Sequence, residues 1–140
     1  MAIQQGLTTS FKQQMIQAGQ NLATDSLKIA LYTAFSNIGA NTTVYTTDNE
    51  ITGTGYTAGG IALTGVTIGT SSDGVVFVDF ANAVWPNSQL TARGALIYNV
   101  TRSNASVAVL DFGSDKVTSN DTFTINFPTA DANNAIVRIS

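Results

Sequence analysis

From Leu27 onward, apolar residues recur at every second position within short runs, and this period limits the fold more than any other feature of the chain. Period two puts apolar side chains on one face of a β-strand, and the runs are rich in β-branched and aromatic residues. Turn-forming sequences such as SSDG (71–74) and RSNA (102–105) separate them. We expect about eight strands, at 27–34, 42–46, 61–68, 75–80, 94–100, 106–112, 122–127 and 135–139.

Short strands at regular intervals with little helix indicate an all-β protein, and we expect an antiparallel jelly roll or β-sandwich. Residues 8–22 predict one short helix, because their apolar residues are spaced along one helical face: Phe11, Met15, Ala18 and Leu22. A hydroxyl side chain at 8–10 is available to cap its start. We therefore expect an N-terminal arm with an amphipathic helix over residues 1–25, and a single jelly-roll domain over residues 26–140.

The balance of charge argues against nucleic acid as a partner. Only 11% of the 140 residues are charged, the net charge is −3, and the six basic residues are scattered. Binding to nucleic acid depends on Lys and Arg that displace counterions from phosphates. No run approaches the roughly 18 apolar residues of a membrane-spanning helix, so we also expect no membrane partner. The chain is expected to be soluble.

The chain contains no histidine and no cysteine. Catalytic schemes based on Ser-His-Asp or Cys-His, and zinc sites of the usual kind, need these residues. We therefore expect no enzymatic activity, no cofactor and no metal. The sequence DFG at 111–113 resembles the magnesium motif of protein kinases, but the histidine of the kinase catalytic loop is missing.

The stretch TDNEITGTGYTAGGIALTG (47–65) is crowded with glycines, as a phosphate-binding loop is. A phosphate loop leads into a helix whose N-terminus faces the anion, whereas a strand pattern follows Gly60. The glycine spacing also fits neither common phosphate-binding motif. We interpret the stretch as a mobile or extended loop that joins two strands, with Tyr56 as a possible contact residue at its tip.

Carboxylates are the remaining candidates for catalytic side chains. Asp79 and Asp111 lie among apolar residues of predicted strands, and two facing carboxylates can hydrolyse a glycoside. The simpler interpretation is an ion pair of a strand aspartate with Arg93 or Arg102. Oxygen ligands for calcium cluster at SNDT (119–122) and TADANN (129–134), but neither sequence has the spacing of a calcium loop.

Trp85 precedes Pro86, which holds it in an extended conformation near a predicted turn. A lone tryptophan in such a place is more often a core or loop anchor than a platform for sugars. An exposed patch that contains Trp85 would instead indicate an interface.

Long segments of the chain resemble a family of small tailed-phage virion proteins, the capsid cement or decoration proteins of short-tailed phages. These segments are LKIALYTAFSNIGANTTVYTTDNEITGTGYTAGGIALTG, TARGALIYN, VAVLDFGSDK and FTINFPTADANNAIVRI. The resemblance covers nearly the whole chain from Ser26 and implies a jelly-roll homodimer that clamps major capsid proteins of an HK97-type shell. It implies synthesis in the host bacterial cytoplasm and a place on the outer surface of the virion, and it brings no catalytic residues.

Three functions follow from these features as hypotheses. The first is a structural protein that stabilises a phage head, and the second is a jelly-roll module of a phage tail that binds a receptor or carbohydrate. The third is a glycosidase that uses the two strand aspartates. As the contact surface we expect the helix and the glycine loop, since both are weakly anchored by local propensity, with Trp85 as a further contact: Phe11, Met15, Leu22, Tyr56 and Trp85.

Overall fold

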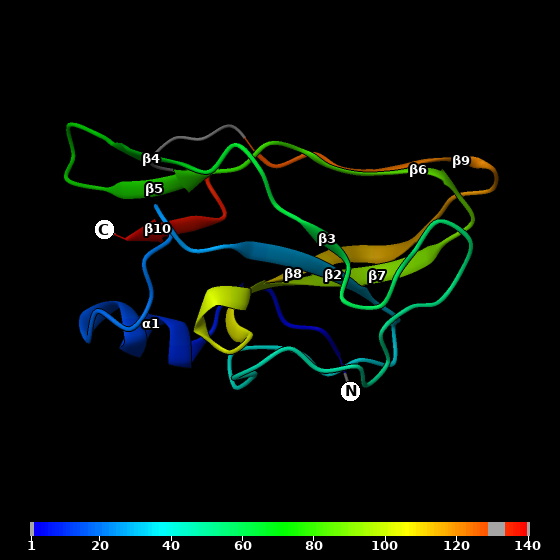
Figure 1. Ribbon diagram of the computed structural model, residues 1–140, viewed down its shortest axis with the longest axis horizontal. Coiled ribbons are helices and arrows are strands. Elements are labelled where there is room, and N and C mark those ends of the chain that lie inside the picture. The colour runs from blue at the N-terminus through cyan, green and yellow to red at the C-terminus, as the bar shows by residue number, and fades with distance from the viewer. Residues whose placement is uncertain (1, 129–133, 140) are drawn as a thin grey trace.

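The computed structural model describes residues 2–128 and 134–139 of the chain (Figure 1). Within them it has ten strands, one α-helix and one turn of 3₁₀-helix. The helices are α1 (Thr9–Ile16) and η1 (Val100–Arg102). The strands are β1 (Gly6–Leu7), β2 (Leu27–Tyr32), β3 (Ile61–Ala62), β4 (Thr67–Thr70), β5 (Val76–Asp79), β6 (Ala83–Ser88), β7 (Thr91–Asn99), β8 (Ala105–Val117), β9 (Asp121–Ile125) and β10 (Val137–Ile139).

The strands form three antiparallel sheets in two layers. One layer is a five-stranded sheet in the order β1-β8-β7-β2-β3. The other layer holds a three-stranded sheet, β10-β5-β4, and a two-stranded sheet, β6-β9, which lie above opposite ends of the large sheet (Figure 1). The predicted all-β sandwich with one short helix is confirmed. The jelly-roll connectivity stays a prediction.

The individual strands differ from the predicted ones at several places, among them β1, which the sequence analysis did not predict. The run 61–68 splits into β3 and β4, and the run 42–46 makes only one bridge, between Val44 and Ala105. The strand β6 was not predicted, because it contains Pro86, which cannot donate a backbone hydrogen bond. Since β6 has a partner on one side only, its proline is tolerated there.

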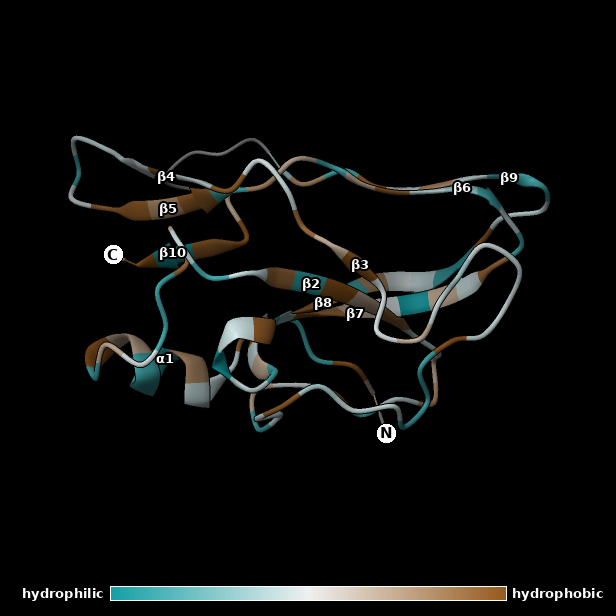
Figure 2. Ribbon diagram, viewed as in Figure 1, coloured by the Kyte–Doolittle hydropathy of each residue, from teal (hydrophilic) through white to brown (hydrophobic). Residues whose placement is uncertain are grey.

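The main core lies between the two layers. It combines residues from the large sheet with residues from both small sheets, and Figure 2 shows the apolar colour concentrated on these strands. Its largest fully buried members include Trp85, Phe11, Leu27, Ile29, Leu31, Leu90, Ile97 and Val107. The period-two pattern of β2 therefore has the predicted consequence, since alternate residues of the strand enter one core.

The opposite face of the large sheet is buried as well. Tyr32 and Tyr98 lie on it with 0% and 3% of their surface exposed, and Ile3 and Ile38 pack against it from other segments. The cover is the N-terminal segment and the long connection between β2 and β3 (Figure 1). The large sheet therefore lies between the two small sheets on one side and these covering segments on the other.

The helix begins as predicted but is shorter than predicted. Thr8 caps it, with its Oγ1 accepting a hydrogen bond from the backbone N–H of Phe11 at 3.2 Å. The helix ends at Ile16, because Ala18 has a φ of 57° in the left-handed region. Leu22 therefore reaches the core from a turn and not from the helix.

Residues 2–25, which we expected to form an arm, share the core of the rest of the chain. The strand β1 pairs with β8, and Phe11 and Leu22 belong to the main core. Buried side-chain hydrogen bonds add to this attachment, since Gln20 donates to the backbone oxygen of Ser106 and accepts from Asn99.

Candidate functional site

The glycine-rich stretch is a packing element and not a phosphate cradle. It leads into β3, as the sequence predicts. Gly60 has a φ of +79°, and a Cβ at this position would lie 1.7 Å from the backbone oxygen of Ile29. A Cβ at Gly53 would lie 2.4 Å from the backbone oxygen of Gln89. Glycine is therefore required at both positions for close approach to neighbouring backbone.

The same stretch is held in place by a carboxylate that the sequence analysis did not single out. Glu50 accepts hydrogen bonds from the hydroxyl of Tyr45 at 2.6 Å, from the hydroxyl of Tyr56 at 2.5 Å and from the backbone N–H of Gly59 at 2.7 Å. Tyr98 donates to the backbone oxygen of Gly59 at 2.6 Å. The loop, which we expected to be mobile or extended, is thus tied to the sheet.

The tyrosines of this cluster act as hydrogen-bond donors. Burial, followed by the hydrogen bond to Glu50, raises the pKa of Tyr45 and of Tyr56 above the usual range. Burial also raises the pKa of Tyr98, with the charge of Glu50 as the second cause. Their hydroxyls therefore stay protonated at neutral pH and donate to Glu50 and to the backbone oxygen of Gly59. Tyr45, Glu50, Tyr56 and Gly59 lie between residues 45 and 59, and Tyr98 joins them from β7.

A second carboxylate, Asp25, is the partner of Arg102. Its Oδ2 accepts hydrogen bonds from Arg102 Nε at 2.8 Å, from Asn99 Nδ2 at 2.8 Å and from the backbone N–H of Asn21 at 2.9 Å. The Asp25 side chain is only 3% exposed. These bonds, with that from Arg102 the largest cause, lower the pKa of Asp25 from 3.8 to about 2.

The two aspartates considered for glycoside hydrolysis belong to different sheets. Asp79 lies in β5 of the three-stranded sheet, and Asp111 lies in β8 of the large sheet. Asp111 forms an ion pair with Arg93, Nε to Oδ1 at 3.5 Å, which is the simpler interpretation given above. The structure therefore pairs Asp111 with an arginine and does not pair it with Asp79.

Of the two calcium sequences, only SNDT lies wholly in the part of the chain that the structure describes. There, no group of three or more acidic residues gathers. At SNDT, Asp121 accepts from the backbone N–H of Thr122, and Asn120 accepts from Gln89. TADANN lies outside the described residues except for Asn134.

Two of the predicted contact residues point inward. Trp85 is 2% exposed and packs against the rings of Tyr56 and Phe123, with centroid distances of 6.3 and 5.8 Å. The hydroxyl of Tyr56 also accepts a hydrogen bond from the backbone N–H of Leu31. The expectation that these side chains reach a partner does not fit this conformation, because both fill the core or its margin.

The other three predicted contact residues meet at one place, a groove between α1 and the three-stranded sheet. Phe11, Met15 and Leu22 line its helical side. The sheet side is apolar because the register places alternate residues of three paired strands on one face. These residues are Ile68 of β4, Val76 and Val78 of β5, and Val137 and Ile139 of β10.

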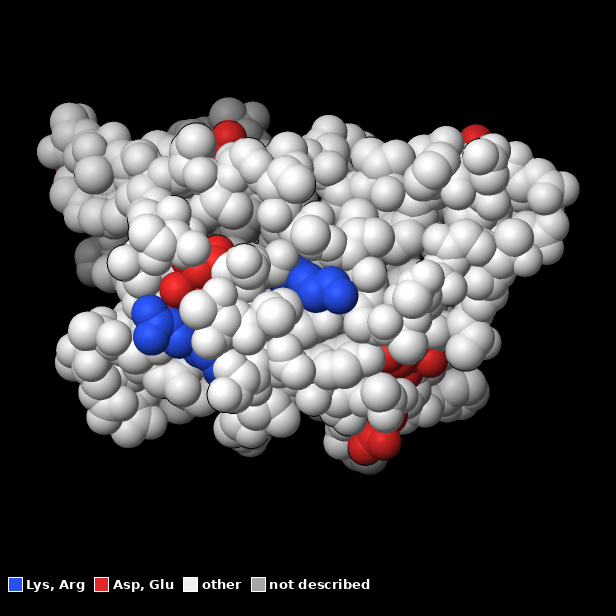
Figure 3. Space-filling view, viewed as in Figure 1, with Lys and Arg blue, Asp and Glu red and all other residues white. Residues whose placement is uncertain are grey.

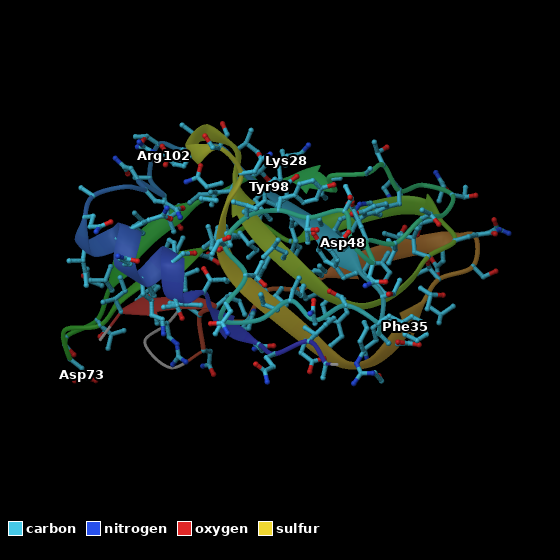
Figure 4. The ribbon with its side chains drawn as sticks, turned by 90° about the horizontal axis from the view of Figure 1, so that it is seen from below. Lys28, Phe35, Asp48, Asp73, Tyr98 and Arg102 are labelled. Atoms are coloured by element: carbon cyan, nitrogen blue, oxygen red, sulfur yellow. The ribbon has the colours of Figure 1, made fainter. Side chains whose placement is uncertain are left out.

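The groove has two adjoining parts, which we call together the α1 groove. The inner part has a volume of about 350 Å³ and extends to Gln20, Asn21 and Arg102. The outer part, of about 370 Å³, is lined by Leu7, Phe11, Lys12, Met15, Ile16, Arg138 and Ile139. Figure 4 shows α1 at the same end of the molecule as the β4–β5 turn, which carries Asp73, and as Arg102.

The apolar residues of the α1 groove are incompletely covered. Ile16 is 90% exposed, Ile68 is 50% exposed, Ile139 is 47% exposed and Val76 is 39% exposed. Figure 2 shows the apolar colour on β5, on β10 and at the end of α1, around the same space. Single exposed apolar residues are ordinary, but several around one groove mark a binding surface. Phe11 and Leu22 form its floor, since they are 1% and 4% exposed.

No family model, curated protein or solved structure matches the chain. Among the residues that the structure describes, no helix is both long and apolar enough to span a membrane.

Proposed function

We propose that this protein is a structural virion protein that binds the outside of an HK97-type phage capsid as a homodimer and cements neighbouring major capsid proteins. The α1 groove is the observation that carries the proposal, because it is an apolar surface that the chain itself leaves partly open. The resemblance to phage cement proteins supports the identity of the partner.

The charge of the surface agrees with such a role. Few charged side chains appear on the face that Figure 3 shows, and most of its area is neutral. A surface of this kind binds through area and shape, and a specific interface buries on the order of 1,200–2,000 Å² in total. A dimer that contacts two capsid subunits gains further affinity because the second contact is intramolecular.

The tail-module alternative depends on an aromatic ring that a sugar can stack on. The two aromatic residues considered for it, Trp85 and Tyr56, pack against each other and into the core. The structure therefore favours the capsid role over a carbohydrate site at these residues.

Co-sedimentation with shells tests the proposal directly. Purified protein is mixed with expanded shells of the phage whose genome encodes it, and bound protein is measured after centrifugation. We expect saturable binding to the shells and none to unassembled capsid subunits. Shells without the protein should break at lower temperature or force than decorated ones. Absence of binding, or equal shell stability with and without the protein, would contradict the proposed function.

A further inference from the structure

We infer that the α1 groove binds an apolar segment of the capsid subunit that carries carboxylates beside its apolar side chains. This inference rests on the proposed function for the identity of the partner, whereas the chemistry of the segment follows from the groove itself. Two independent features of the groove define that chemistry, its apolar walls and the sign of the charges around them.

The walls specify apolar side chains. Residues of three strands stand in two rows on the sheet side, since Ile68, Val78 and Val137 are paired in register, and so are Val76 and Ile139. These rows are not fully covered, since Ile68 is 50% exposed, Val76 39% and Ile139 47%. An apolar segment laid against the open part would bury the exposed surface of both walls, and removal of that surface from water favours binding.

The charged residues that line the groove are all basic. They are Lys12 and Arg138 in the outer part and Arg102 in the inner part, so half of the six basic residues of the chain lie here. No acidic residue lines either part among the described residues. Arg102 is paired with Asp25, so Lys12 in the outer part is the basic group that we assign to the partner.

This local charge is opposite in sign to the charge of the whole protein, which is −3. Complementary charges at the rim of an interface determine which partner binds and in what register. Carboxylates of the partner segment are therefore placed beside the outer part, next to Lys12, with apolar side chains between α1 and the sheet.

Binding of synthetic peptides tests the chemistry without the shell. Two fluorescent peptides share one run of leucine and valine and differ only in flanking glutamates or flanking lysines, and a third has serines in the run. We expect the wild-type protein to bind the glutamate-flanked peptide most tightly in a fluorescence polarisation titration, and more weakly at high salt. The net charge of −3 attracts the lysine-flanked peptide at long range. Tighter binding of the glutamate-flanked peptide would therefore show that the peptide binds at the basic residues of the groove.

Substitutions on both sides of the groove localise the binding. Ile16→Ser and, separately, Ile68→Thr should weaken binding of the glutamate-flanked peptide by about tenfold, because each removes apolar surface that the peptide covers. Lys12→Glu should weaken it by about threefold to tenfold and reduce its salt dependence. The matched controls are Phe35→Ser, which removes a side chain 79% exposed elsewhere, and Lys116→Glu, an exposed lysine outside the groove. Both controls should bind like the wild type.

Several results overturn the inference. They are absence of peptide binding, equal binding of the glutamate and lysine peptides, and wild-type affinity in all three groove variants. Sedimentation velocity gives one further contradicting result. If Ile16→Ser converts a dimer to a monomer, the occupant of the groove is a second copy of the chain and not a capsid segment.

The shell assay separates this inference from the proposed function. If wild-type protein and groove variants bind shells equally well, the protein is a cement protein and its groove is not the contact. If the wild-type protein prefers the glutamate peptide but does not bind shells, the groove chemistry holds and the capsid role fails.

Discussion

At the scale of single residues, two carboxylates organise the polar part of the structure. Glu50 accepts three hydrogen bonds within the connection between β2 and β3, and Asp25 accepts three at the junction between the N-terminal segment and η1. Both carboxylates replace water as the partner of several donors at once. Hydrogen bonds to charged groups contribute more than neutral ones, so these residues stabilise the connections that cover the large sheet.

Replacement of Glu50 by glutamine should lower the free energy of unfolding by about 1–3 kcal/mol, because a neutral amide accepts fewer and weaker hydrogen bonds than a carboxylate. Urea denaturation followed by circular dichroism measures the change. Asp48→Asn is the matched control, since Asp48 lies in the same connection and is exposed. Equal stability of the Glu50 and Asp48 variants would show that the cluster does not hold the connection.

Asp25 predicts a pH dependence of stability. Its pKa in the folded protein, about 2, lies below the ordinary value of 3.8, so the folded state binds the proton less readily than the unfolded state. The contribution of the carboxylate is complete above about pH 4 and is lost as the pH falls toward 2. The difference in unfolding free energy between wild type and Asp25→Asn should therefore close over this range. A difference that is constant from pH 6 to about pH 2 would contradict the assignment.

At the scale of elements, the glycine-rich stretch shows how local sequence and packing combine. Its glycines allow the chain to pass against the backbone of β2 and to enter β3 at the edge of the large sheet. The helix α1 shows the reverse relation, since its pattern extends to Leu22 but its backbone turns at Ala18.

Gly60→Ala should destabilise the protein by several kcal/mol, on the order of 3 or more, because the new Cβ meets backbone that cannot move aside. Gly74→Ala is the matched control, because Gly74 also has a positive φ, +84°, but nothing lies within 4 Å of its Cβ position. The control carries the backbone strain without the clash and should lose only about 1 kcal/mol. Thermal unfolding of the two variants compares them, and an equal loss would mean that φ alone requires Gly60.

At the scale of the whole molecule, both faces of the large sheet are covered. The small sheets cover one face of the large sheet, and the N-terminal segment with the β2–β3 connection covers the other. Because β1, Phe11 and Leu22 are parts of the same sheet and core, the first 25 residues are expected to fold with the rest. The α1 groove exists only where these residues meet the three-stranded sheet.

Deletion of residues 1–25 should therefore prevent folding of the remaining chain. Loss of a buried phenylalanine side chain alone costs about 3–5 kcal/mol, against a typical total stability of about 5–15 kcal/mol. We expect an amide spectrum without dispersion and no cooperative thermal transition for residues 26–140, whereas the full chain should unfold in one transition. A dispersed spectrum from residues 26–140 would establish the separate domain that the sequence analysis expected.

Local pattern was sufficient for the class of fold. The alternation in β2, β5, β7, β8 and β9 is a property of neighbouring residues, so it can be read without knowledge of the partner strand. The cap at Thr8 and the strand after Gly60 are local in the same sense. Phe11, Met15 and Leu22, which were predicted as contact residues from their amphipathic spacing, line one groove. Such a spacing indicates which side chains are removed from water.

Contacts between distant segments decided the rest. No local pattern shows that Tyr98 donates to the backbone oxygen of Gly59, that Trp85 turns inward, or that β6 pairs with β9 across more than thirty residues. The α1 groove likewise joins a helix near the start of the chain to β10 near its end. Alternation determines that a strand forms and which side chains share a face, whereas only the folded chain determines what covers that face and what is left open.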